Sequence, residues 1–215
     1  MKKDTRKIAA AGMLCALTYV VMAVGRVPVV LFLKYDPSDI IVTLGGLIWG
    51  PMMAFAVSAA VAVIEMLTAS DTGVLGCIMN IVQTVSFACT AAAIYQKRRT
   101  LGGAVAGLLT GCAAMVTVMM LWNYFLTPLY MGYPREAVAE LLLPAFLPFN
   151  LLKAGLNASV TFLLYKPVVT ALRKSRLVPA AGSRRAQGRP AGLLLAAALA
   201  AATCLLFLLS WNSLI

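Results

Sequence analysis

The sequence has no histidine and few charged residues, and each absence removes a class of function. Only 12% of the 215 residues are charged, and just seven residues are acidic. Without histidine, the commonest metal ligand and general base is missing. There is also no HExxH, GxSxG or Walker A motif, which excludes the zinc-protease, serine-hydrolase and P-loop ATPase patterns. We therefore expect no catalytic residues, no metal and no cofactor.

The five cysteines also lack the spacing of a functional site. They are scattered through apolar runs and form no CxxC pair. This pattern is typical of small packing residues, and it argues against a disulfide framework or a metal site.

What the sequence has in excess is hydrophobic residues. They make up 62% of the chain, and the mean hydropathy is +0.92. A soluble domain is about 45–50% apolar and about 25% charged. The apolar runs are mostly about 20 residues long without period-2 alternation, which predicts membrane-spanning helices and not a β-barrel. The fold class is therefore an all-α, multi-pass membrane protein, with predicted spans at 8–25, 38–49, 52–68, 75–95, 101–126, 144–170 and 191–211.

The net charge of +11 is distributed as membrane topology requires, and not as a nucleic-acid surface would be. Lys and Arg gather at 2–7, at 97–99 and between 166 and 189, at the ends of apolar runs. All three clusters lie on one side only if the run 40–67 makes two passes, broken at Trp49-Gly50-Pro51. The prediction is an amino terminus inside, with the first apolar run retained as a helix and not cleaved as a signal peptide.

Three regions follow from this topology. Residues 1–172 form a six-helix domain, residues 173–190 form a basic cytoplasmic linker, and residues 191–215 form an additional transmembrane helix. That last segment has almost no polar residues, so we expect it to face lipid.

Lys153 is the most unusual residue in the predicted spans. A lysine at the centre of a membrane helix costs about 2.5–3.5 kcal/mol on insertion scales, so such residues are candidates for function. Asn150, Lys153 and Asn157 share one helical face at i, i+3 and i+7. The alternative is a lysine that snorkels toward the headgroups. The neighbouring amides favour a site, because an amide gains nothing from snorkelling.

Asn123 lies near the outer end of the fifth predicted span. Together with Asn150 and Lys153 it would supply amide donors, amide acceptors and one cationic donor, a set that suits a planar heterocycle. Hydrogen bonding between helices explains Asn123 alone equally well.

Further polar residues occupy the third and fourth spans. Asn80, Gln83 and Thr84 form a second polar face, and Glu65 could pair with Lys153 and neutralise it. Hydrogen bonding between helices is the simpler interpretation for these residues. Asn80 is nevertheless a candidate for contact with a ligand.

The predicted outer loops, 26–38 and 127–143, mix aromatic residues, proline and charge. Tyr35, Tyr124 and Tyr130 are candidates for stacking on a ligand or covering it. In "KYDPSD", Asp36 or Ser38 is expected to cap the second helix. An outward-facing pocket beneath these loops is the natural hypothesis.

Three segments together resemble one family. "LKYDPSDIIVTLGGLIWGP", "NYFLTPLYMG" and "PFNLLKAG" occur in order within residues 5–172. They are similar to the riboflavin-binding S component of energy-coupling factor (ECF) vitamin transporters. The resemblance implies six helices that hold riboflavin near the outer surface, in the cell membrane of a prokaryote. It also implies partners in that bilayer: a membrane T component and two cytoplasmic ATPases.

The resemblance also assigns residues. The flavin-contacting amides and lysine of the family correspond to Asn123, Asn150 and Lys153. The small residues that dock its first helix onto the T component correspond to Gly12 and Ala16. The family often has Ala-xxx-Ala where this chain has Gly-xxx-Ala, and its six helices lack the seventh predicted here.

Rival readings remain open from the sequence. The nearest is an S component for pantothenate, thiamin or folate. A membrane-embedded lipid-modifying enzyme using Glu65 or Asp71 is a rival of another class, and a purely structural partner of a membrane complex is a third.

Overall fold

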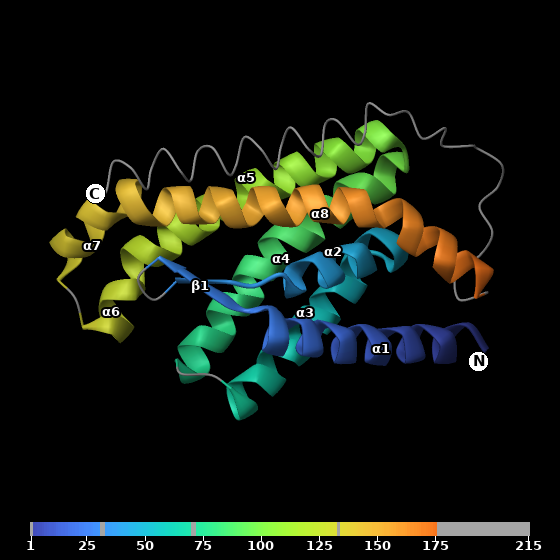
Figure 1. Cartoon of the computed structure of the whole chain (residues 1–215), viewed down its shortest axis with the longest axis horizontal. Coiled ribbons are helices and arrows are strands. Elements are labelled where there is room, and N and C mark those ends of the chain that lie inside the picture. The colour runs from blue at the N-terminus through green and yellow to red at the C-terminus, as the bar shows by residue number, and fades with distance from the viewer. Residues whose placement is uncertain (1, 31–32, 70–71, 133, 176–215) are drawn as a thin grey trace.

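A computed structural model describes residues 2–30, 33–69, 72–132 and 134–175. Its elements, in chain order, are α1 (Lys2–Gly25), β1 (Val27–Val30), β2 (Leu33–Tyr35), α2 (Ser38–Trp49), α3 (Pro51–Thr68), α4 (Gly73–Arg98), α5 (Leu101–Phe125), α6 (Thr127–Met131), α7 (Arg135–Leu141), the π-helical turn η1 (Leu142–Phe146) and α8 (Leu147–Lys174). The bundle of helices is closed at one end by the short antiparallel pair β1–β2 and by α6 and α7 (Figure 1).

Five helical segments are long and apolar enough to cross a membrane, and α2 is a shorter apolar helix of 12 residues. Together they account for the six predicted passes of residues 1–172, with bounds close to those expected. The predicted helix at 191–211 lies outside the described residues. The prediction of an all-α membrane bundle is therefore confirmed for the part that the structure describes.

The predicted break between α2 and α3 falls at Gly50. This residue adopts φ 112°, a conformation that L side chains rarely adopt, and its N–H bonds the carbonyl of Gly46 at 2.8 Å. Pro51 occupies the first turn of α3, where its missing N–H costs no helical bond. The chain therefore turns back on itself here, as the grouping of the basic clusters requires.

The basic residues gather at one end of the bundle. The start of α1, the turn from α4 to α5 and the end of α8 all lie at the right in Figure 1, opposite the β1–β2 pair. Lys97 and Arg98 close α4, and Arg99 ends it in a left-handed conformation with φ 45°. Thr100 then caps α5 by accepting a hydrogen bond from the Gly103 N–H at 3.0 Å. The basic clusters that the sequence predicts on one side of the membrane therefore lie at one end of the folded bundle.

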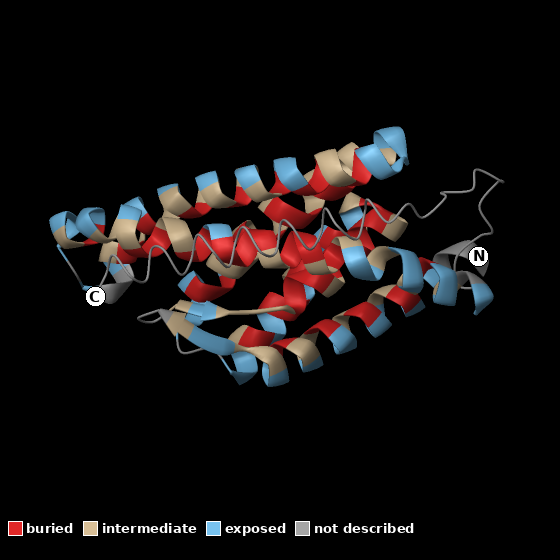
Figure 2. Cartoon of the chain, turned by 45° about the horizontal axis from the view of Figure 1, so that its top comes forward, coloured by how far each residue is buried: buried red, intermediate tan, exposed pale blue. Residues whose placement is uncertain are grey.

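Buried residues face the interior of the bundle, while the outward side of α1 is exposed (Figure 2). The short helix α2 is the most enclosed element, since nine of its 12 residues are buried. Its neighbours α1, α3, α4 and α8 surround it. The polar residues that α2 carries near Ser38 are consequently held away from lipid.

Glycines allow α4 and α5 to approach closely. A Cβ added at Gly107 would lie 2.6 Å from the Ala91 carbonyl oxygen, and one at Gly111 would lie 2.7 Å from that of Phe87. Both neighbours are helix backbone, which cannot move aside without separating the helices. This contact fixes the position of α5 against α4.

We expect Gly107→Ala to destabilise the protein by about 1–3 kcal/mol, because the added methyl overpacks a backbone contact. The measurement is the thermal unfolding midpoint in detergent. Gly102→Ala is the matched control, since no atom lies within 4 Å of a Cβ at that position of the same helix. Equal midpoints for the two variants would contradict the close packing of α4 and α5.

Candidate functional site

A small cavity lies inside the bundle near the β1–β2 end. Its volume is about 30 Å³, enough for one or two water molecules and far below the roughly 300–1,000 Å³ of a typical ligand pocket. Residues of α1, α2, α3, α4 and α8, with Asp36 ahead of α2, form its walls. The polar members are Thr18, Asp36, Ser38, Asp39, Ser58, Glu65, Asn80, Gln83, Thr84 and Lys153. The structure therefore shows a small cavity with a largely polar lining among the helices of a membrane bundle.

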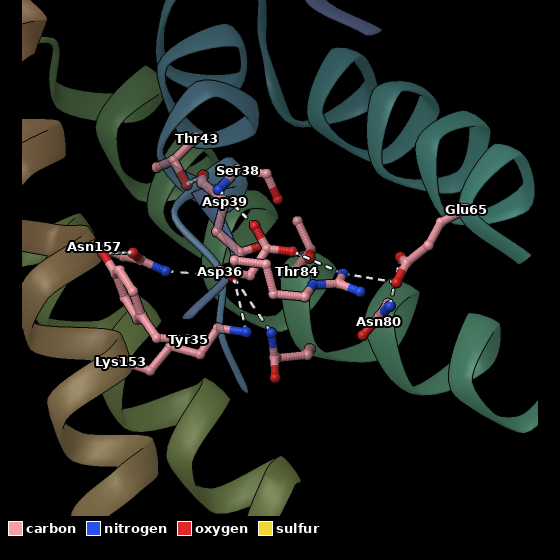
Figure 3. Close-up of polar contacts among 12 residues, drawn as sticks. Tyr35, Asp36, Ser38, Asp39, Thr43, Glu65, Asn80, Thr84, Lys153 and Asn157 are labelled. Carbon is pink, nitrogen blue, oxygen red and sulfur yellow. Dashed lines mark hydrogen bonds and ion pairs between the residues drawn. The ribbon is translucent and has the colours of Figure 1, made fainter. Parts of the chain in front are cut away.

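Asp39 is the central acceptor beside this chamber (Figure 3). Its Oδ1 accepts a hydrogen bond from Thr84 Oγ1 at 2.6 Å. Its Oδ2 accepts bonds from Gln83 Nε2 and Asn157 Nδ2, each at 3.3 Å, and lies 3.7 Å from Lys153 Nζ. Asp39 and Lys153 are 3% and 5% exposed. A buried charge is tolerated only when it is paired and hydrogen-bonded, and Asp39 meets both conditions.

A second polar network joins α3 and α4 to Arg26 and Asp36, the residues on either side of the β1–β2 pair. Arg26 Nη2 lies 3.0 Å from Asp36 Oδ2 and 2.6 Å from Glu65 Oε1. Asn80 Nδ2 donates to Glu65 Oε2 at 2.7 Å. Glu65 therefore pairs with Arg26 and not with Lys153, whose partner is Asp39. The suggestion that Glu65 neutralises Lys153 is wrong.

Pro37 occupies the N-cap position of α2 without a side-chain cap, and Asp36, one residue before it, bonds the first backbone N–H of the helix. Its Oδ1 accepts the Ser38 backbone N–H at 2.8 Å. Burial alone would raise the pKa of Asp36, but Lys153, the hydrogen bonds from Ser38 and the charge of Arg26 together hold that pKa below its usual value. Asp36 is therefore an anion that faces the cavity.

The structure separates the predicted substrate-binding residues Asn80, Asn123, Asn150 and Lys153 into two groups. Lys153 and Asn80 line the cavity, whereas Asn123 and Asn150 are buried but form no part of its wall. Asn150 Nδ2 donates to the Phe146 carbonyl at 2.8 Å. Asn123 Oδ1 accepts from Thr127 Oγ1 at 3.1 Å, while its Nδ2 has no hydrogen-bond partner among the described residues. An unpaired buried amide donor suits a residue that awaits a ligand.

The three predicted tyrosines have different surroundings. Tyr35 donates from its hydroxyl to Asn157 Oδ1 at 3.0 Å and so ties β2 to α8. Tyr124 is 40% exposed and packs edge-to-face on Phe125. The side chain of Tyr130 lies outside the described part of the chain. Of the two tyrosines whose side chains are described, Tyr35 is the one linked to the Asp39 cluster.

The two predicted docking residues lie on the outer side of α1. Gly12 and Ala16 are both exposed, and a Cβ at Gly12 would meet nothing within 4 Å. The opposite side of the same helix, with Leu14, Thr18 and Met22, is buried.

Asp39 is the residue that sequence reasoning missed. The segment "KYDPSD" was interpreted as the start of a helix, and that interpretation gives Asp39 no partner in the bundle. A usable signal was nevertheless present, because a fully buried lysine requires an anion. Asp36, Asp39 and Glu65 were the nearest candidates, and nothing in their spacing distinguishes them.

We expect Asp39→Asn to lower stability by about 3–5 kcal/mol, because it leaves the buried Lys153 ammonium without its counter-charge. The measurement is thermal unfolding of the purified protein in detergent. The double variant Asp39→Asn/Lys153→Gln should recover most of the loss. Glu140→Gln, at an exposed position on α7, is the control, and an Asp39→Asn midpoint equal to the control's would contradict the ion pair.

Comparisons with known proteins agree with this architecture. The family model described as "ECF transporter, substrate-specific component" matches residues 6–165. The chain is 31% identical to the riboflavin transporter FmnP of Bacillus subtilis (strain 168) over 142 residues, which cover 62% of this chain and 74% of that protein. It is 26% identical to the riboflavin transporter RibU of Staphylococcus aureus (strain TCH60), over 80% of this chain and 95% of that protein.

A solved S component of a bacterial ECF transporter has the same fold, with a TM-score of 0.69 at 24% identity. The match covers 79% of this chain and 99% of the solved chain. Because the family model spans far more than half of the sequence, the chain belongs to the substrate-specific (S) components of ECF transporters.

Proposed function

We propose that this S component captures riboflavin from outside the cell and passes it to an energising module for ATP-driven uptake. The observation that carries the proposal is the buried Lys153, which shares a face of α8 with Asn150 and lines the polar cavity. Two relatives named as riboflavin transporters support the choice of vitamin.

The chemistry of the flavin ring matches the predicted contact residues. Its pyrimidine portion carries carbonyl oxygens, ring nitrogens and one N–H, which pair with amide groups and a cationic donor. Asn123 has an unpaired Nδ2, and Lys153 is held by Asp39 at 3.7 Å, longer than a charge-assisted hydrogen bond of about 2.7–2.9 Å. Both groups therefore have donor capacity for a ligand carbonyl.

The proposed setting is the cell membrane of a prokaryote, with the amino terminus in the cytoplasm. The grouping of Lys97, Arg98 and Arg99 with the start of α1 and the end of α8 supports this orientation. The β1–β2 end, with the cavity beneath it, then faces outside.

The alternative of a lipid-modifying enzyme is weakened because its candidate catalytic residue, Glu65, is already paired. Glu65 is occupied by Arg26 and Asn80, so it is not a free acid or base. Asp71 lies outside the described residues. The rival vitamins pantothenate, thiamin and folate remain the alternatives that a binding measurement must exclude.

The first test is the binding of riboflavin itself. The purified protein in detergent should quench riboflavin fluorescence with submicromolar Kd, and excess thiamin, pantothenate or folate should not compete. A folded sample without such binding, or with competition by one of these vitamins, would overturn the choice of ligand.

Lys153→Met should weaken riboflavin binding about tenfold or more, since hydrogen bonds to a charged group contribute about 1.5–3 kcal/mol. The matched control is Lys97→Met, which removes the same charge from an exposed position at the opposite end of the bundle. Fluorescence titration gives both constants, and a melting curve checks that each variant is folded. An unchanged Kd for Lys153→Met would mean that the lysine does not contact the vitamin.

We also propose that the exposed side of α1 docks on a T component that carries two ATPases. Ala16→Leu should leave the Kd for riboflavin unchanged and abolish uptake by cells, because a large side chain keeps the two helices apart. Ala56→Leu, at an exposed position on α3, is the control and should transport normally. Normal uptake by the Ala16 variant would rule out this docking register.

A further inference from the structure

An open groove runs along the last turns of α8, at the end of the bundle opposite the β1–β2 pair. Its volume is about 450 Å³, and it is lined by Lys166, Pro167, Thr170, Ala171 and Lys174. Lys166, Thr170 and Lys174 recur every four residues and so lie along one side of the helix. Pro167 and Ala171 have short side chains that leave the space between the two exposed lysines unfilled. The groove is therefore a short apolar hollow with an ammonium group at each end.

The groove lies at the depth of the membrane surface. A hydrocarbon core about 30 Å thick is crossed by about 20 helical residues, and the stretch from Leu147, the first residue of α8, to Lys166 has that length. Leu163 and Leu164, in the turn before Lys166, are exposed, as lipid-facing residues are. The hydrocarbon region therefore ends close to Lys166, and the groove continues into the layer of lipid headgroups.

A pair of tyrosines gives the same depth independently. The Tyr95 hydroxyl on α4 is hydrogen-bonded to the Tyr165 hydroxyl on α8, and the two rings meet edge-to-face with their centroids 5.5 Å apart. Tyrosine is enriched where a membrane meets water. The contact also places the basic end of α4, with the exposed Lys97 and Arg98, at the same level as the groove.

The groove has no acidic neighbour to balance its lysines. Neither Lys166 nor Lys174 forms an ion pair within the part of the chain that the structure describes. Asp4 is the one described acidic residue at this end of the bundle. The other described acidic residues lie toward the β1–β2 end and are Asp36, Asp39, Glu65, Glu136 and Glu140. The charge of the groove therefore calls for an anion from elsewhere.

The surroundings of the groove decide which anion fits. Pro167 and Ala171 offer no hydrogen bond to a soluble phosphate, but they provide a surface against which the glycerol and first acyl carbons of a phospholipid can pack. A lipid headgroup is already held at this depth, where basic residues attract anionic lipids. The residues that follow α8 do not supply the anion, because 176–190 contain four arginines and no acidic residue.

We propose that the groove between Lys166 and Lys174 binds an anionic phospholipid of the surrounding leaflet. The headgroup phosphate lies between the two ammonium groups, and the glycerol region packs on Pro167 and Ala171. A zwitterionic lipid is a poorer occupant, because its own cation opposes the two lysines. The bound lipid fixes the end of α8 at the membrane surface. This site is separate from the cavity near the β1–β2 pair and does not depend on the vitamin that the protein carries.

The test measures which lipids stay bound to the purified protein. After lipids are removed in detergent and added back, native mass spectrometry should show phosphatidylglycerol bound about tenfold more tightly than phosphatidylcholine with the same acyl chains. Lys166→Gln/Lys174→Gln should reduce that preference about fivefold, because both ammonium groups are lost. Lys97→Gln/Arg98→Gln is the matched control. It removes two charges from exposed positions at the same end, outside the groove lining, and should keep the preference.

A second variant tests the shape of the groove and leaves every charge in place. Ala171→Leu fills the hollow between the lysines and should weaken phosphatidylglycerol binding several-fold. Ala56→Leu makes the same change at an exposed position on α3 and should bind the lipid as the wild type does. A melting curve checks that each variant is folded.

Each contrary result overturns the proposal in a different way. Equal binding of the two lipids by the wild-type protein would show that the groove does not select an anion. Normal lipid binding by Ala171→Leu would reduce the effect to a diffuse attraction by the basic end. Displacement of the lipid by millimolar inorganic phosphate would assign the groove to a soluble anion. A Lys166→Gln/Lys174→Gln variant that keeps the lipid preference but loses riboflavin uptake would make the groove a contact for a partner protein.

Discussion

The buried pair of Lys153 and Asp39 is the constraint on which the arrangement of this bundle depends. An ammonium group in a membrane interior is stable only beside an anion, and the anion itself needs further donors. Asp39 obtains them from α4 and α8 through Thr84, Gln83 and Asn157. Tyr35 extends the same chain of contacts to β2. The charge of Lys153 on α8 therefore constrains where α2, α4 and the β1–β2 pair lie. Apolar contacts between the helices pack around these polar residues.

The helices of this protein were predictable because insertion into a membrane requires long apolar segments with basic residues on one side. Apolar length, the Trp49-Gly50-Pro51 break and the one-sided basic clusters are local signals, and they located every described span closely. Lys153 was identified for the same reason, as a charge where none is expected. Its partner was not identified, because pairing depends on how α2 and α8 cross, and crossing is set by packing between distant segments. The sequence suggested Glu65 as that partner, but Glu65 pairs with Arg26.

The helix α1 has two faces of opposite character, and this connects the two proposed activities. Thr18 lines the polar cavity, while Gly12 and Ala16 lie on the exposed side of the same helix. Only two residues of continuous helix separate Thr18 from Ala16, so a ligand that displaced α1 at the cavity would also move its exposed side. Arg26, directly after α1, binds Asp36 and Glu65 and so anchors that end of the helix to the cavity wall.

The shortness of α2 determines how deep the site lies. Twelve residues rise about 18 Å, whereas the 18 residues of α3 rise about 27 Å from the same turn at Gly50. The start of α2 therefore lies roughly 9 Å short of the end of α3, and Ser38 and Asp39 at that start line the cavity. At that depth the surroundings have a lower dielectric constant than the membrane surface, which strengthens each hydrogen bond to a captured molecule. A shortened helix thus sets the polar groups of the cavity deep enough for a few of them to hold the proposed ligand strongly.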